Sequence, residues 1–257
     1  MSKSPPADIA GLYRYPVKGL TPEPLKKVAL EVGRTLPADR RYAIENGVSG
    51  FDPTAPSWMP KTVFLMLMRN ERLADLRSLF EDETNILTIR RGGEIVARGD
   101  LETVEGRAAI EGFFTQNFAA ELKGPPKVLS SDGHSFSDVA KKVVSIINLE
   151  SLRAIEGMVG HPVHHLRFRA NLYLRGWPAW HEAALVGRTL AIGEARLRIV
   201  KNITRCAATN VDPDTAARDL EIPEALMRRF GHNECGIYGE VISDGTIAIG
   251  DTITVHD

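Results

Sequence analysis

Residues 201–214 read K-N-I-T-R-C-A-A-T-N-V-D-P-D and place Cys206 where an apolar strand gives way to a polar turn. Just before this stretch Leu197 and Ile199 alternate almost regularly with their neighbours, which is typical of a half-buried strand. Arg205 directly precedes the thiol, and a neighbouring cation favours the thiolate, which is a nucleophile and a soft metal ligand. On the residues alone a second interpretation stands beside this one, because a free cysteine is often a small, inert, buried side chain.

The length and charge of the chain describe a soluble globular protein. Its 257 residues are enough for two small domains, each with a buried core. The net charge of -1 shows none of the basic excess that a nucleic-acid-binding protein carries. We therefore expect no nucleic-acid partner, and any positively charged site must be local.

The cysteine count limits the redox groups that the chain can hold. Two cysteines cannot form a disulfide framework or a four-cysteine iron–sulfur cluster, and their number suits a reducing compartment. No G-x-G-x-x-G loop follows a predicted strand, so we expect no dinucleotide site. Residues 1–6 lack the apolar core of a signal peptide, and no apolar run is long enough to span a membrane. We expect a cytoplasmic protein without membrane contact, whose redox partners are separate proteins.

Short strands separated by turn residues, with only a few helices, predict a mainly β fold with a few helices (α+β). Helices are expected at 104–118, which has amphipathic spacing, and more briefly at 71–80, 151–156 and 222–230. The expected strands lie at 8–15, 27–32 and 40–45 (the last two in an antiparallel meander), 62–68, 85–89 and 94–97 (a hairpin on Gly92 and Gly93), 142–149, 167–172, 187–200 (a hairpin), and 235–242 with 245–255 (a pair turning on Asp244 and Gly245).

Residues 205–215, R-C-A-A-T-N-V-D-P-D-T, resemble the R-C-x-x-T-x-V-D-P-D-T run of MOSC domains, the molybdenum cofactor sulfurase C-terminal family. Within that family the likeness is greatest to the mitochondrial amidoxime-reducing component and its bacterial relatives. The resemblance covers nearly the whole chain. In the family's order it includes Y-P-V-K at 15–18, D-R-R-Y at 39–42, F-S-D at 136–138, R-F-R-A-N at 167–171, and the closing runs G-I-Y-G-E-V at 236–241 and I-A-I-G-D at 247–251.

The resemblance implies an N-terminal β-rich subdomain, residues 1–124, packed on a MOSC β-barrel, residues 125–257, with a positive cleft between them for molybdopterin. The Gly-Pro-Pro run that begins at Gly124 supports this boundary, because glycine and proline interrupt regular structure. By the same resemblance Cys206 is the catalytic residue and the protein ligand of molybdenum. The implied cofactor-binding residues are Lys18, Gly19, Arg40, Arg167, Arg169, Asn171, Arg205, Thr209 and Asn210.

These residue types suit an anionic cofactor. An ammonium on a loop, such as that of Lys18, can approach a phosphate, and a guanidinium can grip one with two parallel hydrogen bonds. The alternation over 167–172 predicts a strand with Arg167, Arg169 and Asn171 on one face. That face either receives the phosphate and the pterin or is a solvent-exposed face paired with acidic neighbours.

The implied function is that of a molybdenum-cofactor oxidoreductase. It would reduce N-hydroxylated compounds or N- and S-oxides with electrons from a separate flavin or iron–sulfur protein. The alternative is a sulfur or molybdenum-cofactor carrier that receives sulfur from a cysteine desulfurase and holds a persulfide on Cys206, without substrate turnover. A catalytically silent β-barrel binding module is a third possibility. Cys235 matches no catalytic position, so we expect it to be structural unless it resolves a sulfurated Cys206.

Overall fold

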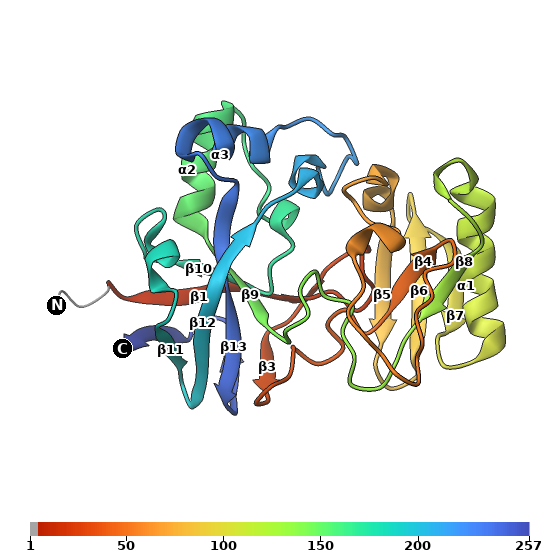
Figure 1. The fold of residues 1–257 in the computed structure, drawn as a ribbon, viewed down its shortest axis with the longest axis horizontal. Helices are drawn as coiled ribbons and strands as arrows, with labels where there is room; N and C mark the ends of the chain where they lie inside the picture. Colours follow the sequence, from red (N-terminus) through yellow and green to blue (C-terminus); the bar gives the residue numbers. More distant parts are fainter. Residues whose placement is uncertain (1–4, 257) are drawn as a thin grey trace.

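A closed β-barrel forms the larger part of the molecule, which a computed structural model describes for residues 5–256 (Figure 1). Its strands follow the order β10-β9-β13-β12-β11-β15-β1, and pairing of β1 with β10 closes the ring. The short β2 (Glu23–Pro24) extends the sheet beside β1. The barrel strands are β1 (Ala7–Arg14), β9 (Val144–Asn148), β10 (Leu172–Arg175), β11 (Thr189–Ile192), β12 (Ala195–Thr204), β13 (Glu234–Ser243) and β15 (Thr252–His256).

Alternation along the strands fills the barrel. In β12 the side chains of Ala195, Leu197 and Ile199 are buried, while the residues between them are more exposed. Successive side chains of a strand point to opposite faces, so the apolar set enters one common core. Trp177 is 1% exposed and belongs to this core.

A second, smaller unit lies on the other side of the molecule (Figure 1). A three-stranded antiparallel sheet packs against α1 (Val104–Asn117) in an apolar core, and Thr103 caps this helix by accepting a hydrogen bond from the Gly106 N–H. A Cβ atom on Gly99 would lie 2.2 Å from the Gly106 carbonyl oxygen, so this approach of strand and helix requires glycine. The strands here are β4 (Ala43–Asn46), β5 (Arg77–Glu81), β6 (Ile86–Arg91), β7 (Glu94–Asp100) and β8 (Pro126–Leu129), and β4 pairs with β8.

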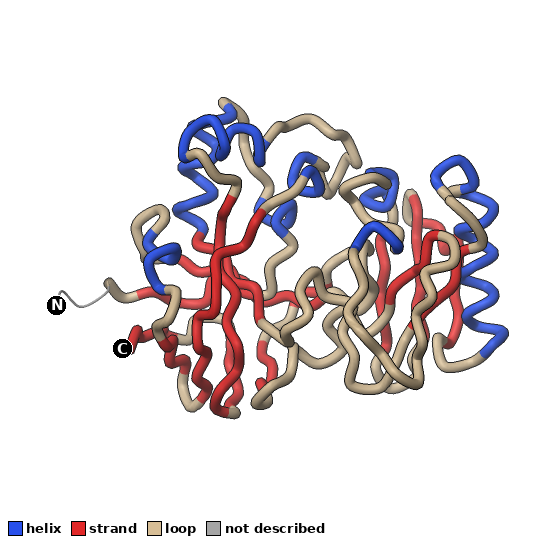
Figure 2. The backbone as a smooth tube through the Cα atoms, in the orientation of Figure 1, coloured by secondary structure: helices blue, strands red, loops and turns tan. Residues whose placement is uncertain are grey.

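The other two α-helices, α2 (Leu149–Val159) and α3 (Ile222–Phe230), pack together beside the barrel. Loops and short 3₁₀ helices rather than long regular elements run between the barrel and the smaller unit (Figure 2). A further strand pair joins β3 (Lys27–Leu30) to β14 (Gly245–Ala248). The 3₁₀ helices are η1 (Lys61–Val63), η2 (Glu71–Asp75), η3 (Ala119–Glu121), η4 (His165–Phe168), η5 (His181–Leu185) and η6 (Ala207–Asn210).

The mainly β fold, the barrel and three α-helices are confirmed among residues 5–256, but five local predictions were wrong. The segment 62–68 contains η1 and no strand, because its apolar side chains enter separate cores: Phe64 packs with Phe136, and Leu65 lies in the core under α1. The segment 71–80 is η2 followed by β5 rather than one helix.

The segment 167–172 is η4 followed by Arg169 in the left-handed conformation, with φ 51°, which ends the expected alternation. The expected meander is replaced by the pairs β3–β14 and β4–β8. The expected pair of strands on Asp244 and Gly245 is absent, since β13 pairs with β12 and β9 while β14 pairs with β3.

The division of the chain at residue 124 stays a prediction. Among residues 5–256, four strand pairs cross that position: β1–β10, β1–β15, β3–β14 and β4–β8. Within residues 5–256 the structure contains no helix with the length and apolar character needed to cross a membrane. Part of the segment that we compared with a signal peptide, residues 1–4, lies outside the described residues.

Candidate functional site

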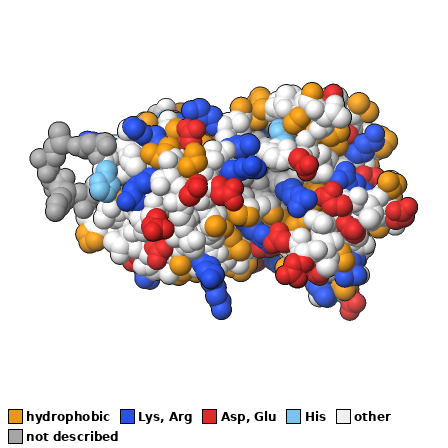
Figure 3. All heavy atoms as spheres, turned by 90° about the horizontal axis from the view of Figure 1, so that it is seen from below, with side chains coloured by type: hydrophobic (Ala, Val, Ile, Leu, Met, Phe, Trp, Pro, Cys, Tyr) orange, Lys and Arg blue, Asp and Glu red, His pale blue; other side chains and the backbone are white. Residues whose placement is uncertain are grey.

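A cleft of about 330 Å³ is lined by residues from both the barrel and the smaller unit. Its lining includes seven lysines and arginines but only two carboxylates, those of Asp39 and Asp138. This local excess of positive charge exists although the face in Figure 3 intersperses both signs of charge. Nine of the ten predicted site residues line the cleft: Lys18, Gly19, Arg40, Arg167, Arg169, Asn171, Arg205, Cys206 and Thr209.

Asn210 is the predicted site residue outside the cleft lining. It is buried, and its Oδ1 accepts a hydrogen bond of 2.9 Å from the Ile222 N–H at the start of α3. Its carbonyl oxygen accepts a hydrogen bond from Arg167. In this structure Asn210 therefore joins the loop after Cys206 to α3.

Cys206 follows the end of β12, and its thiol is partly exposed. Its carbonyl oxygen accepts hydrogen bonds of 3.0 Å from both the N–H and the hydroxyl of Thr209, which fix the turn. Cys235, in contrast, is 3% exposed, and burial raises the pKa of its thiol to about 12. Of the two cysteines, only Cys206 presents its sulfur to the cleft.

Lys61 lies beside Cys206, and no motif or local pattern predicted it as a site residue. Burial acts to lower the pKa of Lys61, but attraction to the Asp138 carboxylate and to Cys206, with a hydrogen bond to Cys206, raises it. The Lys61 Nζ lies 3.9 Å from an Asp138 carboxylate oxygen. Lys61 follows a proline-rich loop, and only the packing of that loop brings it to the thiol.

Lys18 is 7% exposed, and residues of the F-S-D segment at 136–138 hold its ammonium. The resemblance to MOSC domains had implied no role for the residues of this segment. The Lys18 ammonium donates to the Asp138 carboxylate and, at 2.9 Å, to the Phe136 carbonyl oxygen. Burial lowers the pKa of Lys18. For Asp138, burial favours the neutral acid, but the positive charges of Lys18 and Lys61 act against it and lower the pKa of the carboxyl well below its usual range. Asp138 therefore balances two cations of the cleft.

Arg40 and Arg169 form a stacked pair around Tyr15. Their guanidinium carbons lie 4.6 and 4.4 Å from the centre of the tyrosine ring, and an Arg40 Nη2 donates a hydrogen bond of 2.9 Å to the Arg169 carbonyl oxygen. Both backbones are left-handed, with φ of 52° and 51°, a conformation that bulky residues rarely adopt and that clusters at functional sites. Asp39 forms an ion pair of 2.5 Å with Arg40.

The Arg169 guanidinium has no hydrogen bond or ion pair with any other residue of the range 5–256. Burial, together with the charge of Arg40, lowers its pKa to about 10, so it remains protonated at neutral pH. Arg205 is 8% exposed and donates to the carbonyl oxygens of Cys235 (2.7 Å) and Phe168 (2.9 Å), but its Nη2 is buried without a partner. Buried donors are nearly always satisfied, so such an orphan marks a site where another acceptor fits.

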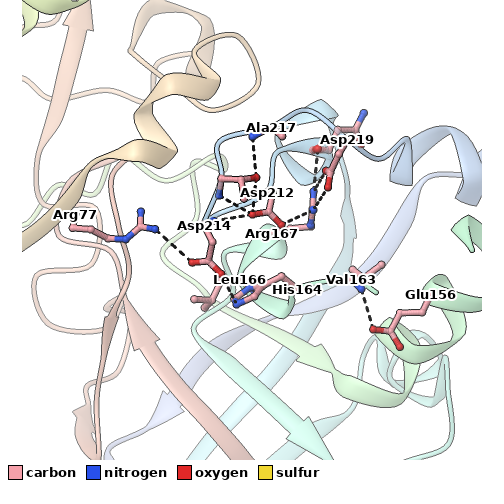
Figure 4. Close-up of polar contacts among 12 residues, drawn as sticks. Arg77, Glu156, Val163, His164, Leu166, Arg167, Asp212, Asp214, Ala217 and Asp219 are labelled. Carbon is pink, nitrogen blue, oxygen red and sulfur yellow. Dashed lines mark hydrogen bonds and ion pairs between the residues drawn. The ribbon is translucent and has the colours of Figure 1, made fainter. Parts of the chain in front are cut away.

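Arg167 is engaged inside the protein (Figure 4). It is 3% exposed, and its guanidinium donates to Asp212 (2.8 Å), to both oxygens of Asp219 (2.8 and 2.9 Å) and to the Asn210 carbonyl oxygen. These contacts hold the loop that follows Cys206. The Asp219 carboxylate is therefore bound to an arginine and does not cap α3, whose N-cap residue is Glu221.

Asn171 is similarly occupied. Its Oδ1 accepts hydrogen bonds from the Ser145 N–H (3.0 Å) and hydroxyl (2.7 Å), and its Nδ2 donates to the Tyr13 carbonyl oxygen (3.2 Å). Arg167 and Asn171 thus border the cleft while most of their polar atoms bind other residues of the chain. They do not share a strand face with Arg169, because the predicted strand does not form.

The loop after Cys206 also binds the smaller unit. Arg218 donates hydrogen bonds to the Leu67 carbonyl oxygen (3.1 Å) and to the Glu71 carboxylate (3.0 Å), and also to the Ala207 carbonyl oxygen beside Cys206. Asp214 lies between Arg77 and His164, at 3.4 and 3.8 Å (Figure 4). These contacts fix one wall of the cleft.

Comparisons with known proteins find one family model and a distant relative. The MOSC domain family model matches residues 131–254. Mitochondrial amidoxime-reducing component 1 of Mus musculus is 26% identical over 136 residues, which are 48% of this chain and 39% of that protein. The chain therefore matches less than half of that relative's length.

Two solved structures are also similar. The YuaD protein from Bacillus subtilis has a TM-score of 0.48 and 16% identity, covering 100% of this chain and 99% of that chain. YiiM from Geobacillus stearothermophilus has a TM-score of 0.36 and 18% identity, covering 44% of this chain and 54% of that chain. The match to the MOSC domain family model therefore spans residues 131–254, which include Cys206 and the loop after it.

Proposed function

We propose that this protein is a molybdenum-cofactor-binding oxidoreductase that reduces N-hydroxylated compounds or N- and S-oxides with electrons from a separate protein. The observation that carries the proposal is the shared cleft: the Cys206 thiol lines it together with the Arg169 guanidinium, which has no hydrogen-bonding partner among residues 5–256. The MOSC domain and the likeness to an amidoxime-reducing component support it.

The residues present fit an anionic cofactor that carries a soft metal. Arg169 is free to bind a phosphate, and Arg205 adds a second guanidinium to the lining of the same cleft. The N–H of Gly19 forms no hydrogen bond within residues 5–256. Gly19 has φ 86°, and a Cβ atom there would lie 2.8 Å from the Leu65 carbonyl oxygen, so glycine keeps this amide accessible.

We assign the phosphate end of the cofactor to Arg169 and the Gly19 N–H, with Lys18 and Arg40 supplying positive charge behind them. Arg205 and Thr209 shape the wall next to Cys206, whose thiolate is a suitable ligand for a soft, redox-active metal. Three further residues do not bind the cofactor directly but position these groups through the contacts described above: Arg167, Asn171 and Asn210. The bound cofactor supplies the two-electron redox chemistry.

The chain's own residues orient the reactants and manage protons. Reduction of an N-hydroxyl group to an amine takes up two electrons and two protons and releases water. Lys61 is protonated and lies beside Cys206, and Asp138 holds its ammonium in that position. We assign to the Lys61 Nζ the role of stabilising negative charge, and of holding a proton, at the end of the cleft where substrate would react.

The alternative is a carrier of sulfur or of the molybdenum cofactor, loaded by a cysteine desulfurase. The same thiol would serve it. Cys235 cannot readily resolve a persulfide on Cys206, since its thiol is buried and its raised pKa of about 12 keeps it protonated. A carrier would therefore need an external acceptor.

Metal analysis and turnover separate these functions. Protein from a molybdenum-replete host should contain molybdenum and should reduce an amidoxime or N-oxide with reduced viologen, but not with NADH alone until a flavin or iron–sulfur reductase is added. Cys206→Ser should abolish this turnover. Molybdenum-loaded protein without viologen-driven turnover, but with Cys206-dependent transfer of labelled sulfur from a desulfurase, would refute the enzyme and favour the carrier.

A further inference from the structure

A second hollow adjoins the cleft next to the proline-rich loop at 52–60. It has a volume of about 470 Å³, and Trp58, Val143, Val200 and Tyr238 contribute apolar surface to its walls. We call it the vestibule. The vestibule and the cleft are adjacent, since five residues line both: Asp138, Val139, Val143, Lys201 and Tyr238.

Trp58 is the most distinctive residue of the vestibule. Trp58 is 46% exposed, and its ring makes no aromatic contact or hydrogen bond with other residues between 5 and 256. The other two tryptophans are packed: Trp177 is 1% exposed, and Trp180 lies 4.9 Å from the Phe230 ring. Trp58 is thus a large aromatic surface without an internal partner, on the loop that leads to Lys61.

The charges around the vestibule are mostly paired. Asp138 is bound by Lys18 and lies near Lys61, and Lys141 lies 3.5 Å from Glu240. Lys201 has no carboxylate partner within the described range 5–256, and its ammonium lies 5.8 Å from the Tyr238 ring centre. The vestibule therefore combines apolar walls with one free positive charge.

We propose that the vestibule binds the body of the substrate, and that this body is a flat aromatic ring that stacks on Trp58. Its reducible N–O group would then extend into the cleft toward Cys206. An anionic substituent on the ring would be favoured by Lys201, and a cationic one disfavoured. The orientation of the N–O group rests on the proposed function, whereas binding of the aromatic ring does not.

Binding is tested on the full-length protein as purified, with three non-reducible probes: benzamide, 4-carboxybenzamide and 4-(aminomethyl)benzamide. Calorimetric titration should rank the carboxylated probe first and the ammonium probe last. Trp58→Ala should weaken all three by roughly two- to tenfold, the range expected for loss of an aromatic pair, and Trp58→Phe should restore most of the affinity. Lys201→Met should remove the preference for the carboxylate.

The matched control is Trp180→Phe, which changes a tryptophan away from the vestibule and should leave all three affinities unchanged. Because Trp58 is half exposed, its variants should retain the wild-type urea midpoint. Equal probe affinities in wild type and Trp58→Ala, or a preference for the ammonium probe, would overturn the proposal.

A kinetic comparison separates this proposal from the proposed function. Trp58→Ala should raise KM for an aryl amidoxime and leave KM for hydroxylamine, which has no ring, unchanged. Absence of turnover with any substrate would refute the reductase, and the probe titrations would still decide the vestibule. Turnover with no change in either KM would refute the vestibule and leave the reductase standing.

Discussion

Arg167 and Arg169 are two residues apart in sequence, and the structure gives them opposite roles. The Arg169 guanidinium stacks on Tyr15 and binds no carboxylate or carbonyl within residues 5–256, whereas that of Arg167 binds Asp212 and Asp219. We therefore compare Arg169→Met with Arg167→Met. Methionine keeps an unbranched apolar stem in both and removes only the charged group.

The expected effects on stability differ. Removing one partner of a buried ion pair costs about 3–5 kcal/mol, and we expect about 3 kcal/mol for Arg167→Met, because the Asp219 side chain is 45% exposed and water can solvate it. Arg169→Met loses only a contact between a cation and an aromatic ring, which contributes about 1–2 kcal/mol at a partly buried site. Urea unfolding of both variants measures these losses.

The expected effects on the cofactor are reversed. A hydrogen bond to a charged group contributes about 1.5–3 kcal/mol, so Arg169→Met should weaken retention of the cofactor by about ten- to a hundredfold. Bound pterin per protein, measured in variants that remain folded, tests this. If Arg169→Met retained full pterin occupancy, or unfolded as readily as Arg167→Met, the division between a binding and a structural arginine would be wrong.

Three further predictions follow from the same cleft. Cys206→Ser should lose metal-dependent turnover while keeping its fold, and Cys235→Ser should keep both metal and turnover; metal analysis and a viologen assay would expose the reverse pattern. Lys18→Ala and Arg40→Ala should each lower pterin occupancy, whereas Lys26→Ala, at an exposed position, should not. The pKa of Asp138 is lower in the folded protein than its ordinary value of 3.8. The ionised carboxylate therefore stabilises the folded state above about pH 4, and this stabilisation is lost as the pH falls from 3.8 toward the folded-state pKa. Asp138→Asn should therefore be less stable than wild type at pH 7, and this difference should shrink in acid unfolding curves below about pH 4.

The sequence was informative where a local pattern determines a local structure. The alternation before Cys206 correctly predicted β12, and the spacing of Ile110, Phe113 and Phe114 correctly predicted α1. The family pattern selected Arg40 and Arg169, which the structure brings together at Tyr15. Each of these features depends on residues that are close in sequence or on a motif that was matched as a whole.

Other features depend on contacts between distant segments, and no local pattern reports them. Lys61 and Cys206 are far apart in sequence, and only the fold brings both of them to the cleft. The run at 62–68 looked like one buried strand because the pattern shows only that its side chains are apolar, and not that Phe64 and Leu65 enter different cores. Left-handed φ values at Arg40 and Arg169 have no sequence signal either, since arginine has no preference for that conformation.

The position of β1 has a consequence for how the chain is synthesised. This strand pairs with β10 and β15, so the barrel cannot close until Thr252–His256 has left the ribosome. At about 5–20 residues per second, β1 waits roughly ten to fifty seconds for its last partner. The edge of β1 that pairs with β15 stays open during that time. Charged side chains lie near both ends of the strand, at Asp8 and Arg14. In the folded protein they form ion pairs with Arg175 and Glu23, respectively. Before these partners are in place, the two charges would oppose pairing of β1 with other nascent chains.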